Sequence, residues 1–198
     1  DAKTMVPVDH MGTENNWRQR RDLILGKVCV YTRLEDLISG AKSNSMSLAV
    51  YKPAKIRDFV WEAEDRAWDP AKLEAMRGRA QQGELFPGEE WRMTFNIVRK
   101  LPYSFFYCFE DETGKTRKLQ VLDWELGALY WNCLKRNRGN EADALHQVRA
   151  KYLDEFVQKD LHFFLGTLKE WHFVAPNPWV IIGVFPIPHE SQMELDMS

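Results

Sequence analysis

One heptapeptide limits the possible folds more than any other part of the chain. Residues 179–185 read WVIIGVF, and six of the seven are apolar on both of the faces that alternate along a strand. Such a strand needs cover on both faces, so we expect it inside a sheet and not at an edge. Pro176 and Pro178 precede it, where a missing amide does not interrupt a central ladder. Gly183 leaves room for the backbone or an aromatic ring of a neighbour.

The centre of the chain predicts a β-hairpin followed by two helices. Residues 103–110 and 116–122 have strand character and flank the turn sequence DETGK, in which Gly114 can adopt a positive φ. Apolar residues at helical spacing predict a helix over 123–139 and a second helix over 140–158, which begins at a capping asparagine.

Weaker patterns complete the expected order of elements. They predict helices over 13–26, 33–40 and 71–81, and strands over 47–53, 55–64 and 161–167. Together the patterns predict an α+β fold, with helices packed on one face of a mostly antiparallel sheet. We expect a single domain over 14–186, an irregular N-terminal arm over 1–13 and a flexible tail over 187–198.

Composition argues against several classes of protein. The chain has 198 residues and a formal net charge of −2, which does not suit a general nucleic-acid coat or a membrane-surface protein. No apolar run approaches the roughly 18–20 residues of a membrane span, and no signal peptide is visible. The three cysteines are widely spaced and odd in number. We therefore expect no disulfide framework and a reducing, cytoplasmic setting.

The acidic residues Asp123 and Glu125 have two possible roles. Asp123 stands where a helix N-cap is wanted, and Glu125 in the first turn favours the positive end of the helix dipole. Together these effects would contribute about 1–2 kcal/mol. The alternative is the catalytic pair of a metal-dependent hydrolase or nuclease, assisted by Lys118 or His162. No Asp/Glu-x-Lys sequence follows on a strand, so we favour the cap.

No other complete catalytic or metal-binding set is present in the sequence. None of the five histidines has another histidine four residues away, and the HExxH, GxSxG and phosphate-loop patterns are absent. His162 and His172 flank a predicted strand turn and could converge, but they lack a third ligand. We predict neither a metal nor a cofactor.

Basic residues cluster on the hairpin and near the end of the helix that follows it. The two clusters are Lys115, Arg117 and Lys118, and Lys135, Arg136 and Arg138. Cations also favour a helix C-terminus for structural reasons, and the far end of this helix can lie about 20 Å from the hairpin. Our preferred hypothesis is a non-catalytic module that binds nucleic acid or a protein partner through hairpin 113–118 and nearby loops. Trp171, His172 and His162 are further candidates for its binding site.

Five motifs occur in an order that resembles an uncharacterised family of prokaryotic proteins. They are LPYSFFYCFED, LDWELGALYW, VRAKYLDEF, LHFFLGT and NPWVIIGVF. The resemblance covers about residues 20–186, is stronger from residue 100 onward, and implies no particular activity. Relatives carry Cys and His in the hairpin, which suggests a small metal site, but DETGKTRK has neither and a zinc role does not carry over. Relatives also have an additional N-terminal region, so we expect one before Asp1.

Overall fold

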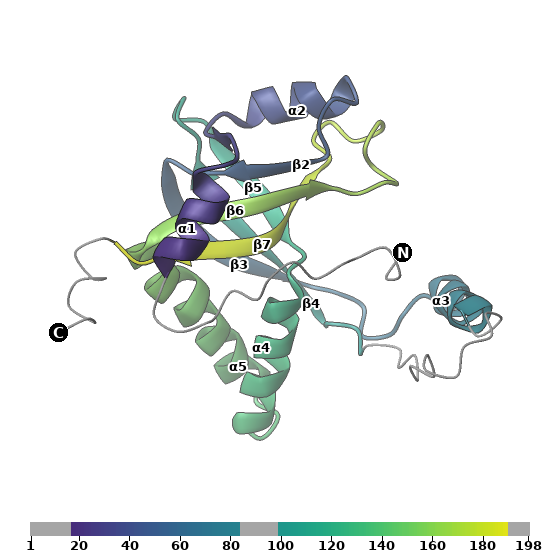
Figure 1. Ribbon diagram of the computed structural model, residues 1–198. Coiled ribbons are helices and arrows are strands. Elements are labelled where there is room, and N and C mark those ends of the chain that lie inside the picture. Colours follow the sequence, from purple (N-terminus) through teal and green to yellow (C-terminus); the bar gives the residue numbers. More distant parts are fainter. Residues whose placement is uncertain (1–16, 84–98, 190–198) are drawn as a thin grey trace. The chain divides into compact units, whose positions relative to one another are not determined.

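The computed structural model describes residues 17–83 and 99–189 (Figure 1). The chain divides into two compact units, one of residues 1–60 and 105–198 and the other of residues 61–104. The predicted arm 1–13 lies outside the described residues, as does the part of the predicted tail beyond residue 189.

A seven-stranded, mostly antiparallel sheet contains all the described strands, in the order β1-β2-β6-β7-β5-β4-β3. The strands are β1 (Val30–Tyr31), β2 (Leu48–Tyr51), β3 (Lys55–Ala63), β4 (Tyr103–Glu110), β5 (Thr116–Val121), β6 (Asp160–Thr167) and β7 (Trp179–Ile187). β1 pairs with β2 and β5 pairs with β7 in parallel, whereas β2–β6, β6–β7 and β4–β5 are antiparallel. The predicted α+β class is therefore confirmed, and so is the hairpin, in which Gly114 has a φ of +78°.

β7 is an inner strand, as its apolar sequence predicted. It lies between β6 and β5, and Ile181 is fully buried. Opposite Gly183, the ring of Phe164 approaches so closely that a Cβ atom would lie 3.1 Å from it. This glycine therefore makes room for an aromatic ring. A register shift beside Phe164 leaves Ile182 unpaired and 44% exposed, so cover on the second face is incomplete there.

The helices lie close to their predicted positions. They are α1 (Trp17–Leu25), α2 (Leu34–Lys42), α3 (Pro70–Gly83), α4 (Trp124–Arg136) and α5 (Glu141–Arg149). α5 continues as a π-helix (Ala150–Glu155) and a short 3-10 helix (Phe156–Gln158), which together fill the predicted span to residue 158. Among the described helices, none combines the length and the hydropathy that a bilayer span requires.

The unit of residues 61–104 contains α3 and has its own local contacts. Asp69 caps α3, because its Oδ1 accepts hydrogen bonds from the amides of Ala71 at 2.9 Å and Lys72 at 3.1 Å. The amide of Glu64 donates to the carbonyl of Pro102 at 2.9 Å.

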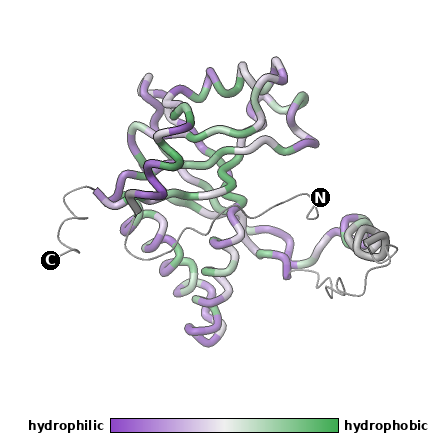
Figure 2. The backbone as a smooth tube through the Cα atoms, viewed as in Figure 1, coloured by the Kyte–Doolittle hydropathy of each residue, from purple (hydrophilic) through white to green (hydrophobic). Residues whose placement is uncertain are grey.

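The core lies between one face of the sheet, here called the core face, and the helices α2, α4 and α5. Aromatic rings from β3, β4 and β6 meet on it, with 4.9 Å between the centroids of Phe59 and Tyr107 and of Tyr107 and Phe163. The hydroxyl of Tyr107 donates to the carbonyl of Tyr152 at 2.6 Å, which joins β4 to the π-helix. Hydrophobic residues follow the strands, whereas the far end of α4 and α5 is hydrophilic (Figure 2).

Replacing Ile181 with Asp should unfold the domain. The side chain is fully buried in the central strand, so a carboxylate there would have neither water nor a partner. We expect a loss of more than about 4 kcal/mol in the free energy of unfolding, measured by chemical denaturation.

Ile182→Asp is the matched control, because this neighbouring side chain is 44% exposed. It should cost about 1 kcal/mol or less. An Ile181→Asp variant that melts cooperatively at the wild-type midpoint would show that the assigned centre of the sheet is wrong.

Candidate functional site

Two cations of the hairpin hold it against α2. Asp111 follows β4, and its carboxylate is fully buried. Its Oδ1 accepts hydrogen bonds from the amides of Thr113 and Lys115, both at 3.0 Å, and its Oδ2 accepts one from Nε of Arg117 at 2.9 Å. Arg117 is only 11% exposed and also pairs with Glu35 of α2, to which Nζ of Lys115 donates at 3.0 Å. We call Glu35, Asp111, Lys115 and Arg117 the hairpin clip.

The charges of the hairpin clip stabilise one another. Hydrogen bonds from Arg117 and Lys115 lower the pKa of Glu35 to about 2. Burial alone would raise the pKa of Asp111, but hydrogen bonds from Thr113, Arg117 and the turn amides outweigh burial and bring it to about 2. Burial also opposes the charge of Arg117, yet its bonds to the two carboxylates raise its pKa. All three groups therefore stay charged at neutral pH. Arg117 has a structural role, because its guanidinium pairs with both carboxylates.

Lys118 lies on the other face of the hairpin from Arg117, because side chains alternate along a strand. It is exposed, and its Nζ lies 4.2 Å from the centroid of the Phe106 ring. This distance is within the range of a cation–π contact.

Asp123 is the N-cap of α4, as the preferred interpretation predicted. Its Oδ1 accepts a hydrogen bond from the amide of Glu125 at 2.9 Å, and its backbone is extended. Across the described residues, no group of three His, Cys, Asp or Glu side chains could hold a metal ion. The hydrolase or nuclease hypothesis for this pair stays a prediction, and no described contact of the two carboxylates favours it.

His162 and His172 lie toward opposite ends of β6. His162 is buried, and its Nδ1 lies 3.2 Å from the carbonyl of Asp160. Burial lowers its pKa, which keeps the ring neutral at pH 7. Nδ1 of His172 lies 2.8 Å from Oγ1 of Thr167. Thr167 is five residues beyond His162 on the same strand, which places the two about 16 Å apart. The structure does not bring the two imidazoles together.

The loop of residues 168–178 displays three apolar side chains to solvent. Trp171 is 53% exposed, Phe173 is 72% exposed and Val174 is 74% exposed. His172, between them in sequence, is buried, and its Nδ1 lies 2.8 Å from Oγ1 of Thr167. We call these three exposed residues the loop triad. Trp171 was a predicted binding candidate, whereas Phe173 and Val174 were not predicted from the sequence.

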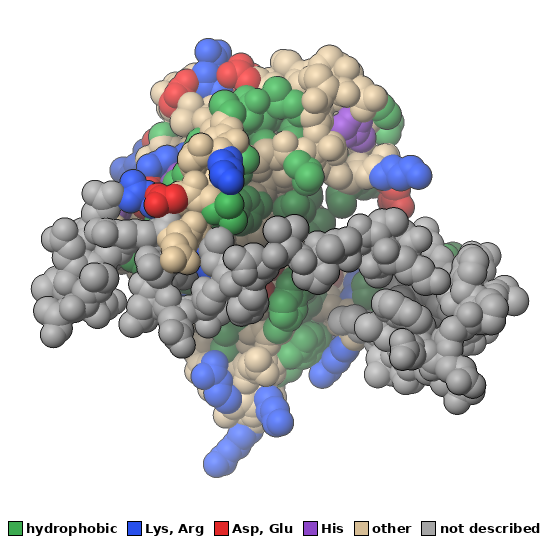
Figure 3. Space-filling view, viewed as in Figure 1, with side chains coloured by type: hydrophobic (Ala, Val, Ile, Leu, Met, Phe, Trp, Pro, Cys, Tyr) green, Lys and Arg blue, Asp and Glu red, His purple; other side chains and the backbone are tan. Residues whose placement is uncertain are grey.

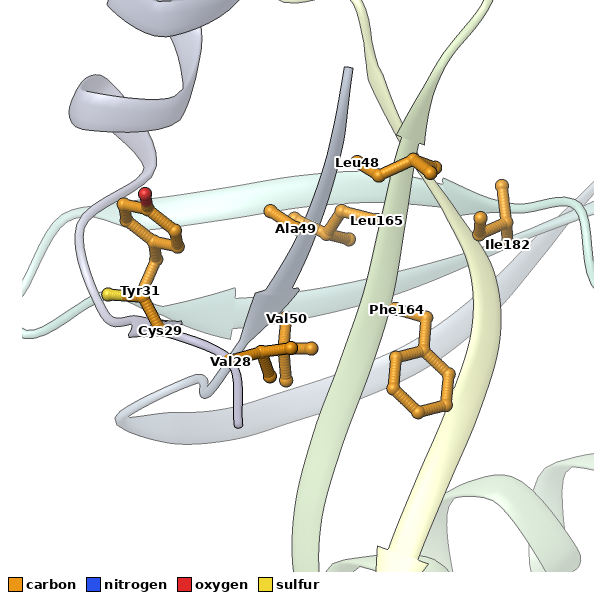
Figure 4. A pocket seen from close by; sticks show the side chains of 9 residues that line it. All are labelled: Val28, Cys29, Tyr31, Leu48, Ala49, Val50, Phe164, Leu165 and Ile182. Carbon is orange, nitrogen blue, oxygen red and sulfur yellow. The ribbon is translucent and has the colours of Figure 1, made fainter. Parts of the chain in front are cut away.

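An apolar pocket of about 520 Å³ opens on the second face of the sheet, opposite the core face (Figure 4). Its lining comes from the β1 segment and from β2, β6 and β7. Leu48 and Ile182 both lie over Gly166, where an added Cβ would come 3.1 Å from Ile182 and 3.6 Å from Leu48. The amide of Thr167 donates to the carbonyl of Ser47 at 3.0 Å, so Leu48 and loop 168–178 lie at the same end of the sheet.

The second basic cluster is well separated from the first. Lys135, Arg136 and Arg138 are exposed at the turn between α4 and α5, whereas the hairpin turn contacts α2. Figure 3 shows Lys and Arg side chains at the lower end of the molecule, where Figure 1 places the α4–α5 turn. The two basic clusters are therefore separate surfaces, which the length of the helix between them had made possible.

A protein-family model matches most of the chain. The model of a family described as Domain of unknown function (DUF8757) matches residues 30–197. The chain belongs to this family. The match to the DUF8757 family begins at the first strand and includes the hairpin, α4, α5 and both closing strands. No curated protein and no solved structure matches the chain significantly.

Replacing Asp111 with Asn should weaken the hairpin clip. Asparagine keeps an oxygen for the turn amides but removes the charge that faces buried Arg117. We expect the free energy of unfolding to fall by about 2–3 kcal/mol at pH 7. Glu112→Gln, the same chemical change at an exposed neighbour, should cost less than about 1 kcal/mol.

The same variant should change the acid limb of the stability profile. Asp111 and Glu35 have pKa values of about 2, below the usual values for these side chains, so their contribution is complete above about pH 5 and is lost as the pH falls toward 2. Asp111→Asn should make this limb shallower in urea unfolding measured from pH 6 to pH 2. An unchanged limb would mean that the hairpin clip does not form in solution.

Proposed function

We propose that this protein is a non-catalytic module that binds a protein partner through the loop triad. The exposure of Trp171, Phe173 and Val174 on one short loop is the observation that carries the proposal. Scattered apolar residues are common on protein surfaces, but adjacent large apolar side chains with this exposure mark interaction sites. Aromatic residues also supply much of the binding energy in protein interfaces.

The backbone of the loop supports this role because it is fixed at both ends. The amide of Trp171 donates to the carbonyl of Leu168 at 2.9 Å, and that of Ala175 donates to the carbonyl of Trp171 at 3.0 Å. His172 anchors the middle of the loop on Thr167, and Oδ1 of Asn177 accepts from the amide of Trp179 at 3.1 Å. A loop already held in one conformation loses less entropy on binding.

The chemistry of the loop favours protein over nucleic acid. Lys169 and Glu170 are its exposed charged residues, and their charges cancel. Phosphate binding requires an excess of cations, which this loop lacks. On the hairpin, Arg117 and Lys115 already pair with Asp111 and Glu35, so the geometry supports a nucleic-acid role there less than it supports protein binding at the loop.

The proposal can be tested with a photo-crosslinking amino acid at position 173. In cells that make the full chain, irradiation should give a defined crosslinked protein, and the same probe at exposed Lys55 should not. The purified partner should then bind the Phe173→Ser, Val174→Ser variant at least about tenfold more weakly than wild type.

Trp124→Ser is the matched control, because this residue is 78% exposed but lies at the start of α4. It should bind the partner with wild-type affinity. The proposal fails if position 173 gives no crosslink beyond that at position 55, or if the loop variant binds as tightly as wild type.

A further inference from the structure

We propose that the turn between α4 and α5 is a second binding surface, which contacts the phosphate backbone of nucleic acid through Lys135, Arg136 and Arg138. It lies on a different part of the molecule from the loop triad and does not depend on the protein-binding role proposed for that loop. The three side chains are exposed within four positions of the sequence.

The absence of carboxylate partners distinguishes these three cations from several other arginines in the described part of the chain. Four arginines elsewhere form salt bridges with carboxylates, namely Arg33, Arg57, Arg117 and Arg149. Among the described residues, no carboxylate forms an ion pair with Lys135, Arg136 or Arg138. The guanidinium of Arg136 donates instead to Sγ of Cys133 at 3.1 Å, a weak acceptor. The turn thus keeps cationic groups available for an anionic partner.

The backbone conformation of Arg138 gives independent support. The amide of Gly139 donates to the carbonyl of Leu134 at 2.9 Å, and that of Arg138 donates to the carbonyl of Lys135 at 3.2 Å. These two bonds define a Schellman motif, in which the residue at the position of Arg138 is usually glycine. Arg138 has a φ of +53°, in the left-handed region that costs a residue with a side chain about 1–2 kcal/mol. A cation therefore occupies a position where glycine would give a more stable turn.

Further hydrogen bonds fix the turn in place. Nδ2 of Asn137 donates to the carbonyl of Cys133 at 2.9 Å, and its Oδ1 accepts from Nε2 of Gln147 at 3.2 Å. Asn140 caps α5 by accepting from the amide of Asp143 at 3.3 Å. The cations are thus mounted on a rigid helical hairpin, which reduces the cost of ordering them on a ligand.

The surroundings of the cations favour a phosphate backbone over a membrane surface. Residues 135–140 read KRNRGN, so the turn presents no apolar side chain. A segment that binds bilayers inserts an apolar face beside its cations. Arginine suits phosphate because its planar guanidinium can donate two parallel hydrogen bonds. The amides of Asn137 and Asn140 already form hydrogen bonds within the turn and α5, so we expect contacts to phosphate and binding without sequence preference.

The experiment is a fluorescence-anisotropy titration of labelled single-stranded and double-stranded oligonucleotides with the full chain at several NaCl concentrations. Three phosphate contacts predict that log K falls with log salt with a slope of about −2 to −3. The triple variant Lys135→Gln, Arg136→Gln, Arg138→Gln should lose at least about tenfold in affinity at low salt. The control variant Lys27→Gln, Lys42→Gln, Lys55→Gln has the same net charge and should bind as wild type.

Arg138→Gly separates binding from folding. Relief of the left-handed backbone should raise the melting temperature by about 2–4 °C, while the lost cation weakens binding. A destabilised Arg138→Gly variant would overturn the argument from backbone strain. Equal losses in the two triple variants, a flat salt response, or equally tight binding to polyglutamate or to vesicles of phosphatidylserine would overturn the assignment to nucleic acid.

Discussion

The pairing of β7 with β5 holds the two halves of the sheet together. Val121 faces Ile181 across this parallel pair, and the amide of Leu122 donates to the carbonyl of Ile181 at 2.7 Å. On one side lie β6, β2 and β1, and on the other the hairpin and β3. Loop 168–178 enters β7, and α4 leaves β5 through the cap at Asp123, so both proposed binding surfaces depend on this junction.

Charge is used in two different ways in the two basic clusters. In the hairpin clip, buried Asp111 and Arg117 need each other, because either charge alone in that position would be strongly destabilising. At the α4–α5 turn the cations remain in water, where they cost the fold little apart from the backbone strain at Arg138. A residue type alone therefore does not reveal its role, and the distribution of carboxylates decides it.

Features set by local sequence could be predicted, and features set by distant partners could not. The hairpin turn, the cap at Asp123 and the inner position of β7 each follow from a few consecutive residues. The salt bridge between Arg117 and Glu35 joins residues far apart in the chain, and no sequence pattern predicted it. Gly139 was the expected end of α4. The helix ends earlier, at Arg136, because Arg138 already adopts the left-handed conformation that usually falls to glycine. Phe173 and Val174 are exposed while His172 between Trp171 and them is buried, and this difference in burial could be seen only in the structure.

We infer that the strand pair β6–β7 presents the loop triad on a rigid loop. Backbone order parameters from ¹⁵N relaxation test it directly, because they compare residues 168–178 with the strands on either side. We predict values of about 0.85 for the amides of Trp171, Val174 and Ala175, similar to those of β7. Values below about 0.6 across the loop would contradict the claim, because the apolar side chains would then sample many orientations.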